Sequence, residues 1–409
     1  MPHDLAGAPG APDAAAHRPL RVLLAGGGTA GHVNPLLATA AALRDAASGG
    51  DPRTEILVLG TAQGLEARLV PEAGYELARV PRVPMPRRPG GDLLRLPGRL
   101  RAAVRAASAA IERVGADVVV GFGGYVSTPA YLAARRAGVP VVIHEQNARP
   151  GLANRLGARW AAGVALTFAS TPLAASRRRG GRTLTTGLPL RPAVAELVAR
   201  RSTEEGARAA RAEGAAALGL DPASPTILVT GGSLGAQHLN EVLARSLGDL
   251  SAGTQVLHLT GRGKDAPVRE ALAQALASGR APADLAGRYH VLDYLTAMEQ
   301  AYACADGVIC RSGAGTVAEL TALGLPALYV PLPVGNGEQR LNAADCVAAG
   351  GGLLVADADL GPQDVTGFVA LVSDPDRRAA ASAAAASTGV RDGADRLADL
   401  IRTVAAQRG

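Results

Sequence analysis

A short apolar run that ends in glycines occurs once in each half of the chain, and this repeated pattern limits what the chain can fold into. The run LRVLLAG at 20–26 leads into the stretch GGTAGHVNP, and the run PTILVT at 225–230 leads into GGSLGA. Apolar runs of strand length that end in glycines and lead into a helix are typical of buried parallel strands. Each half is therefore predicted to be an α/β domain of the Rossmann type.

Further apolar runs extend this alternation of strands and helices. The remaining strands are predicted at 55–60, 116–124, 139–147, 254–261, 289–295, 306–313 and 325–331. The first helix is expected from about residue 34 to 47. Because 409 residues exceed what one ordinary core accommodates, two domains are expected. The predicted boundaries are a disordered tail at 1–18, domains at 19–188 and 189–390, and a C-terminal helix at 391–409.

Composition narrows the class of protein further. Apolar residues make up 48% of the chain and aromatic residues only 3%, so the core must be built from Ala, Val and Leu. The three cysteines, Cys304, Cys310 and Cys346, form no C-x-x-C pair, which favours unpaired thiols in a reducing cytosol. Neither a membrane-spanning apolar run nor the apolar part of a signal peptide is present, so no bilayer span is expected.

The first glycine loop fits the dinucleotide-binding pattern G-x-G-x-x-G at Gly26, Gly28 and Gly31. That function also requires an Asp or Glu at the end of the second strand, to hold the ribose. The second strand here ends in VLGTAQG, without an acid, and Glu55 lies at its start. A nicotinamide enzyme is therefore disfavoured. Two glycine loops in one chain instead indicate a cleft between two domains whose backbone N–H groups bind phosphate, although each loop alone is also explained as a tight turn.

Seven motifs rich in glycine and polar residues follow one another along the chain: GGGTAGHVNP, GFGGYVSTP, HEQNARPG, TGLPLR, GGSLGAQHLN, CRSGAGTVAEL and GNGEQRLNAA. In this order they resemble the MurG family, the bacterial N-acetylglucosaminyltransferases that make lipid II of peptidoglycan. The resemblance implies a GT-B fold, in which two Rossmann-like domains face each other across a cleft. It also implies an inverting transfer of GlcNAc from UDP-GlcNAc to the C4 hydroxyl of the MurNAc unit of lipid I, without a cofactor.

The resemblance further implies which residues bind UDP-GlcNAc. The set is Thr29, Ala30, Gly31, Asn147, Arg191, Ser233, Leu295, Ala314, Gly315, Thr316, Val317, Ala318, Glu319 and Gln339. Within it, Ser233 is expected at the diphosphate, Leu295 at the uracil and Glu319 at the ribose hydroxyls. Three positions depart from the family pattern: Ala30 stands where many members have Gly, Leu295 where they often have Ile, and Glu338 where the best-known members have Gln. Because a carboxylate cannot donate to a sugar hydroxyl, the sugar contact is assigned to Gln339.

His32 follows the first glycine loop at the expected start of a helix. Its imidazole is the candidate general base or acceptor-binding group, since it can take up a proton at neutral pH. The positive helix end is expected to lower the pKa of His32 and keep the ring neutral. Gly28, His32 and Tyr125 are placed on the acceptor side, where the first loop is also expected to meet the diphosphate of lipid I. The alternative for His32 is a purely structural, hydrogen-bonded side chain.

Other polar residues near these motifs were weighed for chemistry. Glu319 is the second candidate catalytic residue, with an acid that only stabilises a helix dipole as the alternative. Glu145 is a further candidate acid or base, and His144 is equally well interpreted as a packed residue at a strand end. The Asp-x-Asp stretches at 357–359 and 374–376 are interpreted as solvated turns. No metal is therefore expected, and helix N-termini and loop N–H groups would stabilise the leaving UDP.

The stretch 79–107 holds eight arginines against one acid, with leucines between them. Basic residues beside an exposed apolar strip suit anionic lipid headgroups, and a solvated basic loop next to a core-facing helix is the alternative. Nucleic acid is disfavoured because no aromatic residues interleave for stacking. We therefore expect reversible attachment to the cytoplasmic face of the cell membrane, and other cell-wall synthesis and division proteins are partners that the resemblance suggests.

Three other functions remain as alternatives to lipid II synthesis. A different GT-B transferase or a UDP-GlcNAc epimerase would use the same donor, but it would not need the lipid acceptor. A nicotinamide oxidoreductase would bind a dinucleotide at the first loop. A membrane-bound sensor or scaffold would bind UDP-GlcNAc without turning it over.

Overall fold

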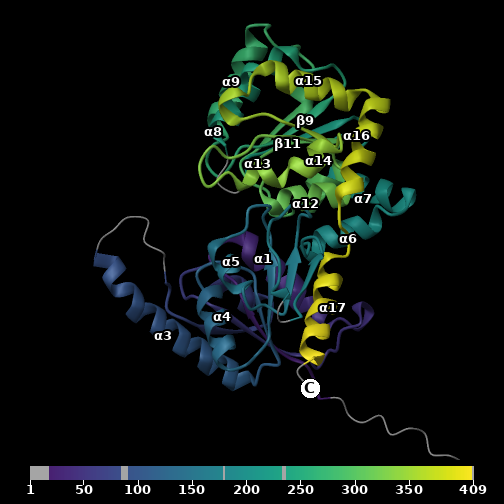
Figure 1. Cartoon of the computed structure of the whole chain (residues 1–409). Coiled ribbons are helices and arrows are strands. Elements are labelled where there is room, and N and C mark those ends of the chain that lie inside the picture. Colours follow the sequence, from purple (N-terminus) through teal and green to yellow (C-terminus); the bar gives the residue numbers. More distant parts are fainter. Residues whose placement is uncertain (1–17, 84–90, 178–179, 233–235, 408–409) are drawn as a thin grey trace, which may run out of the picture.

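The computed structural model describes residues 18–83, 91–177, 180–232 and 236–407, with the backbone alone described at 91–95. It has two α/β domains, one above the other in Figure 1, and each is built on a parallel sheet. Every strand predicted from the sequence is present, with bounds that are equal or somewhat shorter. None of the described helices is long and apolar enough to cross a membrane.

The sheet of the N-terminal domain runs, from edge to edge, through β3 (Glu76–Arg79), β2 (Glu55–Gly60), β1 (Arg21–Ala25), β4 (Val118–Gly121), β5 (Val141–Glu145), β6 (Gly163–Leu166) and β7 (Arg182–Thr185). The central strand β1 pairs in parallel on both sides, so that Val22 lies opposite Ile56 and Val118. The helices of this part of the chain are α1 (Ala30–Arg44), α2 (Glu66–Glu72), α3 (Gly91–Val114), α4 (Ser127–Arg136) and α5 (Leu152–Gly157).

The sheet of the C-terminal domain runs through β10 (Tyr289–Leu292), β9 (Gln255–Leu259), β8 (Thr226–Thr230), β11 (Gly307–Cys310), β12 (Ala327–Tyr329) and β13 (Gly352–Leu354). Its helices are α6 (Pro192–Arg200), α7 (Glu204–Leu218), α8 (Gln237–Arg245), α9 (Ala266–Ala277), α10 (Leu285–Arg288), α11 (Met298–Cys304), α12 (Ala314–Leu323), α13 (Glu338–Asn342), α14 (Ala344–Ala348), α15 (Pro362–Ser373) and α16 (Pro375–Thr388). Both sheets thus follow the same doubly wound order, which makes the two domains structural repeats.

Helices cover both faces of each sheet, because side chains of successive strand residues point to opposite faces. In the N-terminal domain, Leu23 packs with α3 and α4 on one face, and Val22 packs with α1 on the other. In the C-terminal domain, Leu228 packs with α11 and α12, and Val229 packs with α8 and α15. The strands at the centre of the sheets are buried on both sides and therefore appear in the sequence as continuous apolar runs.

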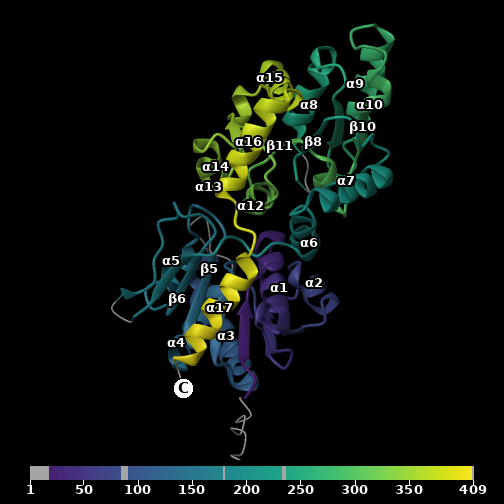
Figure 2. The same cartoon turned by 90° about the vertical axis from the view of Figure 1, so that its right-hand side faces the viewer.

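The last helix, α17 (Gly393–Ala406), leaves the C-terminal domain and packs against the N-terminal sheet. Its Leu397, Leu400 and Ile401 join the same core as Val22 and Leu24. Figures 1 and 2 both show this helix, in yellow, beside the lower domain. The chain therefore crosses between the domains twice, once before α6 and once before α17.

Two features differ from the sequence-based predictions. The strands β3, β6, β7 and β13 were not predicted, because each has only three or four residues and β3, β7 and β13 contain no buried residue. The first helix begins at Ala30 instead of about residue 34, since Thr29 already has the extended backbone of an N-cap residue. The start of the helix thus lies inside the glycine motif, and this brings His32 into its first turn.

Candidate active site

A cavity of about 630 Å³ lies between the two domains. Its walls come from the segments that follow β1 and β5 in one domain and β8, β9, β10 and β11 in the other. In each sheet the order of strands reverses where β1 meets β4 and where β8 meets β11. Ligands of open parallel sheets bind outside the carboxyl ends of the strands at such points. The cavity is therefore the candidate active site.

The first glycine loop and the start of α1 form the wall on the N-terminal side. Thr29, Ala30, Gly31 and His32 all line the cavity. The Nδ1 atom of the half-buried His32 lies 3.0 Å from the hydroxyl of Thr29. Burial lowers the pKa of His32, and the Gly27 carbonyl and the charge of Glu66 oppose this shift only in part. The ring is therefore neutral at physiological pH and able to accept a proton. Burial is the largest cause of the lowered pKa.

The N-terminus of α12 forms the wall on the C-terminal side. Gly313 precedes the helix in an extended conformation, with φ −62° and ψ 147°, and its lack of a side chain leaves the helix without a side-chain cap. The first N–H groups of a helix have no partner within it. Because Gly313, Ala314, Gly315 and Thr316 line the cavity, these N–H groups and the positive end of the helix face it. The arrangement suits a phosphate group.

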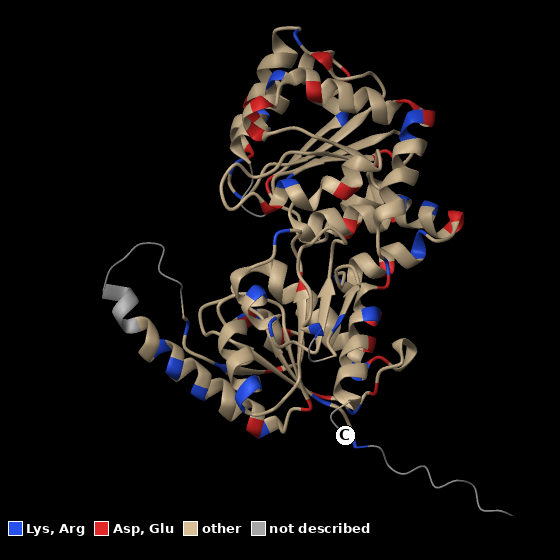
Figure 3. Ribbon diagram, viewed as in Figure 1, with Lys and Arg blue, Asp and Glu red and all other residues tan. Residues whose placement is uncertain are grey.

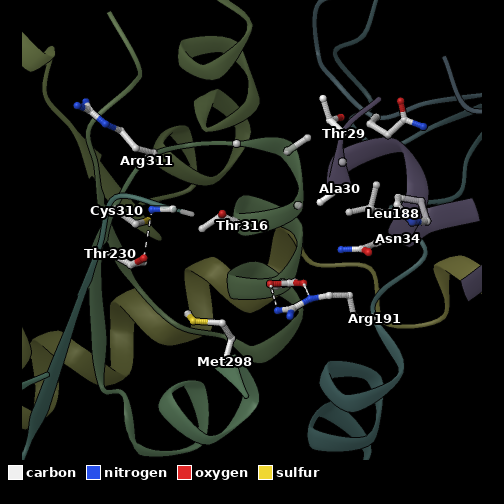
Figure 4. A pocket seen from close by; sticks show the side chains of 18 of the residues that line it. Thr29, Ala30, Asn34, Leu188, Arg191, Thr230, Met298, Cys310, Arg311 and Thr316 are labelled. Carbon is white, nitrogen blue, oxygen red and sulfur yellow. Dashed lines mark hydrogen bonds and ion pairs between the residues drawn. The ribbon is translucent and has the colours of Figure 1, made fainter. Parts of the chain in front are cut away.

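A buried ion pair lies beside this helix end. Arg191 donates through Nε to Oε1 of Glu319 at 2.6 Å and through Nη2 to Oε2 at 3.0 Å. Dashed lines in Figure 4 mark the interaction at the labelled Arg191. The hydroxyl of Tyr302 donates to Oε2 at 3.0 Å. Burial opposes the charge of Arg191, but the ion pair outweighs it and raises the pKa of the guanidinium. Burial and the charge of Glu319 raise the pKa of Tyr302, which stays a hydrogen-bond donor.

Asn147 lines the cavity where the two domains touch. Its side-chain oxygen accepts a hydrogen bond from Asn342 of α13 at 3.3 Å, and Asn342 also accepts from the backbone of Ala148 at 2.9 Å. Behind this contact, Glu145 accepts from the backbone N–H groups of Asn147 and Gly151, both at 3.0 Å, and from the side chain of Asn154. Burial raises the pKa of Glu145. It does not line the cavity, so it holds the loop instead of reaching a substrate.

The other predicted donor-site residues divide into four groups. Leu295 lines the cavity. Val317 and Ala318 are buried and do not line the cavity: Val317 belongs to the core of the C-terminal domain, and Ala318 packs with Leu188 and Leu190 of the linker. Gln339 is turned away, with its side-chain oxygen accepting from the backbone of Leu332 at 3.0 Å, whereas Glu338 lines the cavity. Of these two neighbours, Glu338 is therefore the one that reaches the cavity. Ser233 lies outside the described residues.

Gly28 and Tyr125 line a second, smaller pocket of about 120 Å³ beside the first loop. The guanidinium of Arg82 lies over the ring of Tyr125, 4.9 Å from its centre. The N–H of Gly28 donates to the buried carboxylate of Glu66 at 2.8 Å. That N–H is therefore bonded within the chain. The expectation that the first loop meets the diphosphate of lipid I stays a prediction about the other N–H groups of the loop.

The contacts correct one further expectation, for Asp357, and decide between the two interpretations of His144. Asp357 is not in a solvated turn: it pairs with the buried Arg311 at 2.5 Å, and its side chain is only 14% exposed. His144 is fully buried, and its Nε2 lies 3.0 Å from the carbonyl oxygen of Gly187. Burial lowers the pKa of His144 to about 4, so it serves as a packed residue between β5 and the linker.

Sequence reasoning missed several residues that complete the site. Tyr302 and Met298 reach the cavity from α11, and Leu188 reaches it from the linker. Tyr302 and Met298 belong to no glycine-rich motif, and a Tyr or Met in an apolar helix resembles any core residue. Leu188 lies within the motif TGLPLR but was not singled out, because an apolar residue between Gly187 and Pro189 carries no signal of its own. For Tyr302, the only available signal was its position in the helix preceding β11, on the side of the sheet that α12 also covers.

Comparisons with known proteins agree with this geometry. Models of the glycosyltransferase family 28 N-terminal and C-terminal domains match residues 22–166 and 226–397. A UDP-N-acetylglucosamine--N-acetylmuramyl-(pentapeptide) pyrophosphoryl-undecaprenol N-acetylglucosamine transferase of Bifidobacterium longum is 51% identical, covering 92% of this chain and 95% of the relative. The transferase of the same name from Streptomyces coelicolor is 50% identical, with 95% and 99% covered. The chain belongs to the MurG family.

Solved structures agree with membership of the MurG family and confirm the predicted GT-B fold. The crystal structure of Acinetobacter baumannii MurG superposes with a TM-score of 0.72 at 27% identity, covering 94% of this chain and all of the other. The UDP-GlcNAc 2-epimerase of Neisseria meningitidis, bound to UDP-GlcNAc, superposes with a TM-score of 0.65 at 14% identity and covers 94% of this chain. At that level of identity the epimerase shows the common fold alone.

Proposed function

We propose that this chain transfers GlcNAc from UDP-GlcNAc to the C4 hydroxyl of the MurNAc unit of lipid I, undecaprenyl-diphosphoryl-MurNAc-pentapeptide, and so makes lipid II. The observation that carries the proposal is the interdomain cavity that His32, the N-terminus of α12 and the Arg191–Glu319 pair line together. Relatives that are about 50% identical over nearly the whole chain are named as transferases of the same reaction, which supports the proposal.

Each part of the donor has a matching group in the cavity. Leu295 offers an apolar surface to the uracil, and the carboxylate of Glu319 has lone pairs that can accept from the ribose hydroxyls. The N–H groups at the start of α12 suit the diphosphate, to which Ser233 is also assigned. Asn147 and Glu338 are the polar groups placed for the GlcNAc hydroxyls and acetamide.

The reaction needs a deprotonated acceptor oxygen and a stabilised leaving group. In our proposal the neutral ring of His32 takes the proton of the C4 hydroxyl as its oxygen forms the bond to the anomeric carbon. The bond from that carbon to the diphosphate breaks on the opposite face, so the configuration inverts and UDP leaves with the electron pair. The helix N-terminus of α12 stabilises the charge that develops on the phosphate oxygen.

The proposal is tested by measuring UDP release from UDP-GlcNAc with and without a short-chain lipid I analogue, each in the presence and absence of EDTA. Release that requires the analogue and survives EDTA supports a metal-independent transfer. Release without the analogue points to hydrolysis or epimerisation and contradicts the proposal. Binding of UDP-GlcNAc without any release, in the presence of vesicles, favours a sensor.

We also propose that the chain attaches reversibly to the cytoplasmic face of the membrane through residues 79–107. Figure 3 shows basic residues along α3, which extends from the N-terminal domain. Among the described side chains of this stretch, Arg79, Arg82, Arg101 and Arg105 are exposed. Each arginine near an anionic surface contributes roughly 1 kcal/mol of attraction.

The attachment is tested by sedimentation with vesicles that contain phosphatidylglycerol. We expect substitution of Arg79, Arg101 and Arg105 by Gln to weaken binding on the order of a hundredfold, since about three favourable contacts are lost. The matched control replaces three arginines of the C-terminal domain, Arg245, Arg280 and Arg377, and should bind as the natural chain does. Equal binding by both triple variants would contradict the proposed surface.

A further inference from the structure

Glu66 is a buried carboxylate that the proposed reaction does not use. Its side chain is 0% exposed, and it is the first residue of α2, which follows β2. Its three hydrogen-bond donors are neutral: the N–H of Gly28 at 2.8 Å, the N–H of Thr61 at 2.9 Å and the hydroxyl of Thr61 at 2.7 Å. A carboxylate held only by neutral donors in a buried position needs a specific purpose, because its desolvation is costly.

The surrounding chain is shaped to leave room for this side chain. A Cβ atom at Gly27 would lie 2.5 Å from the carboxylate, one at Gly60 would lie 2.5 Å from Cγ of Glu66, and one at Gly64 would lie 1.9 Å from the carboxylate. Gly27 in the first glycine loop, Gly60 at the end of β2 and Gly64 before α2 therefore all leave room for the side chain of Glu66. The first glycine loop is thus built around an anion that the protein itself supplies.

The carboxylate is connected to His32 through the backbone of the loop. Gly28, which donates to Glu66, is followed by Thr29, whose carbonyl accepts the N–H of His32 at 3.1 Å. The hydroxyl of Thr29 also contacts the ring of His32 at 3.0 Å. On its other side the ring packs closely against Gly123. The position of the ring thus depends on the loop that Glu66 fixes.

We propose that Glu66 is a positioning residue: its carboxylate occupies the anion-binding side of the first glycine loop and thereby orients His32 toward the acceptor. In dinucleotide-binding domains an acid after the second strand holds a ligand that lies on the glycine loop. Here the acid comes a few residues later and bonds to the loop itself. A phosphate placed at the N–H of Gly28 would meet a charge of its own sign.

The charges near His32 add an electrostatic consequence. The neutral groups around the ring are Thr29, the Gly27 carbonyl and Gly123, and the charged group is Glu66. Beyond Gly123 lies Asn154, which donates to Glu145. Burial lowers the pKa of His32, and the negative charge of Glu66 raises it. Without that charge the pKa of His32 falls further.

The test compares Glu66→Gln, Glu66→Asp and the natural chain, with Glu72→Gln as the control on the exposed side of the same helix. For Glu66→Gln we expect kcat to fall about a hundredfold, as small misplacements of a catalytic group do, while the Kd of UDP-GlcNAc stays unchanged. The low-pH limb of the kcat profile should move to lower pH. Glu66→Asp keeps the negative charge, so the low-pH limb of its kcat profile should stay at the pH of the natural chain, even though kcat itself falls.

This inference rests on the proposed function, and a second readout separates the two. The pKa of His32 is measured by NMR on histidine-labelled protein, with the signal assigned through His32→Gln. A natural chain that binds UDP-GlcNAc but does not use lipid I would overturn the proposed function and leave the NMR comparison valid. An unchanged pKa of His32 and an unchanged kcat in Glu66→Gln would overturn the inference. If Glu66→Gln does not fold, Glu66→Asp must still lower kcat without changing donor binding.

Discussion

Tyr302 is the residue of the donor wall whose role is easiest to isolate, because it acts through a single hydroxyl. We predict that Tyr302→Phe raises the Kd of UDP-GlcNAc about tenfold, since a hydrogen bond to a charged group of this kind contributes about 1.5 kcal/mol or more. Oε2 of Glu319 loses its second donor, and the carboxylate is then held by Arg191 alone. Isothermal titration with UDP-GlcNAc measures the change.

The matched control for this prediction is Tyr289→Phe. Tyr289 is also buried and also bonds through its hydroxyl, to His258 at 2.9 Å, but it does not line the cavity. We expect it to lower stability without altering the Kd. Equal loss of donor affinity in both variants would show that Tyr302 acts through general stability.

At the scale of single residues, the glycine-rich motifs predicted those parts of the site in which backbone groups line the cavity. Thr29, Gly31 and the start of α12 could be located because glycines at a strand end report close approach of the backbone. Glu66 and Tyr302 could not, since a lone acid or Tyr carries no local pattern. Their roles depend on contacts between segments that are far apart in sequence, such as Gly28 with Glu66.

At the scale of elements, the loop between β4 and α4 presses against the first glycine loop. Gly124 has φ +80°, and a Cβ atom there would lie 2.6 Å from the carbonyl oxygen of Gly27. We predict that Gly124→Ala lowers the free energy of unfolding by about 2–4 kcal/mol, from the left-handed backbone and the overlap together. Urea denaturation measures the change, and kcat should fall as well because the loop that carries His32 is displaced.

Gly138→Ala is the control that separates the two causes. Gly138 also has a positive φ, of +66°, but no atom lies within 4 Å of a Cβ placed there. It should lose only about 1 kcal/mol, for the backbone alone. If Gly124→Ala and Gly138→Ala are destabilised equally, the overlap between the β4–α4 loop and the first glycine loop does not contribute to the loss of stability.

The elements themselves were predictable to the extent that they are buried. The central strands β1, β4, β8 and β11 have both faces covered and so appear as unbroken apolar runs. The strand β7, with the exposed sequence RTLT, carries no such signal, because it is held by pairing with β6 and not by burial. The two glycine loops indicated a cleft between the two domains, and the family resemblance supplied the GT-B arrangement in which the domains face each other.

At the scale of the whole molecule, two buried histidines predict how stability depends on pH. Burial lowers the pKa of His144 to about 4 and that of His258 to about 3. Below pH 6.5 the unfolded chain binds protons at these rings and the folded chain does not, so stability falls as the pH falls toward 4. His144 alone contributes a loss on the order of 3 kcal/mol.

Thermal unfolding between pH 7.5 and 4.5 tests this dependence. His144→Gln keeps a donor for the carbonyl of Gly187 but removes the titrating ring, so its stability should fall less steeply over this range. His238→Gln, at a half-buried position, should follow the natural chain. A slope that is the same in all three proteins would contradict the assignment.

The return of α17 to the N-terminal sheet predicts which domain the end of the chain stabilises. Leu397 of α17 and Leu239 of α8 are both 0% exposed, and they belong to the cores of the N-terminal and C-terminal domains respectively. Replacing either by Ala should cost about 2–5 kcal/mol. Because the loss is local to one core, hydrogen exchange should separate the two variants. Leu397→Ala should lower the protection of backbone amides against exchange in β1, β4 and β5. Leu239→Ala should lower it in β8 and β9. Loosening of the C-terminal strands by Leu397→Ala would instead mean that the last helix belongs energetically to the domain that precedes it in sequence.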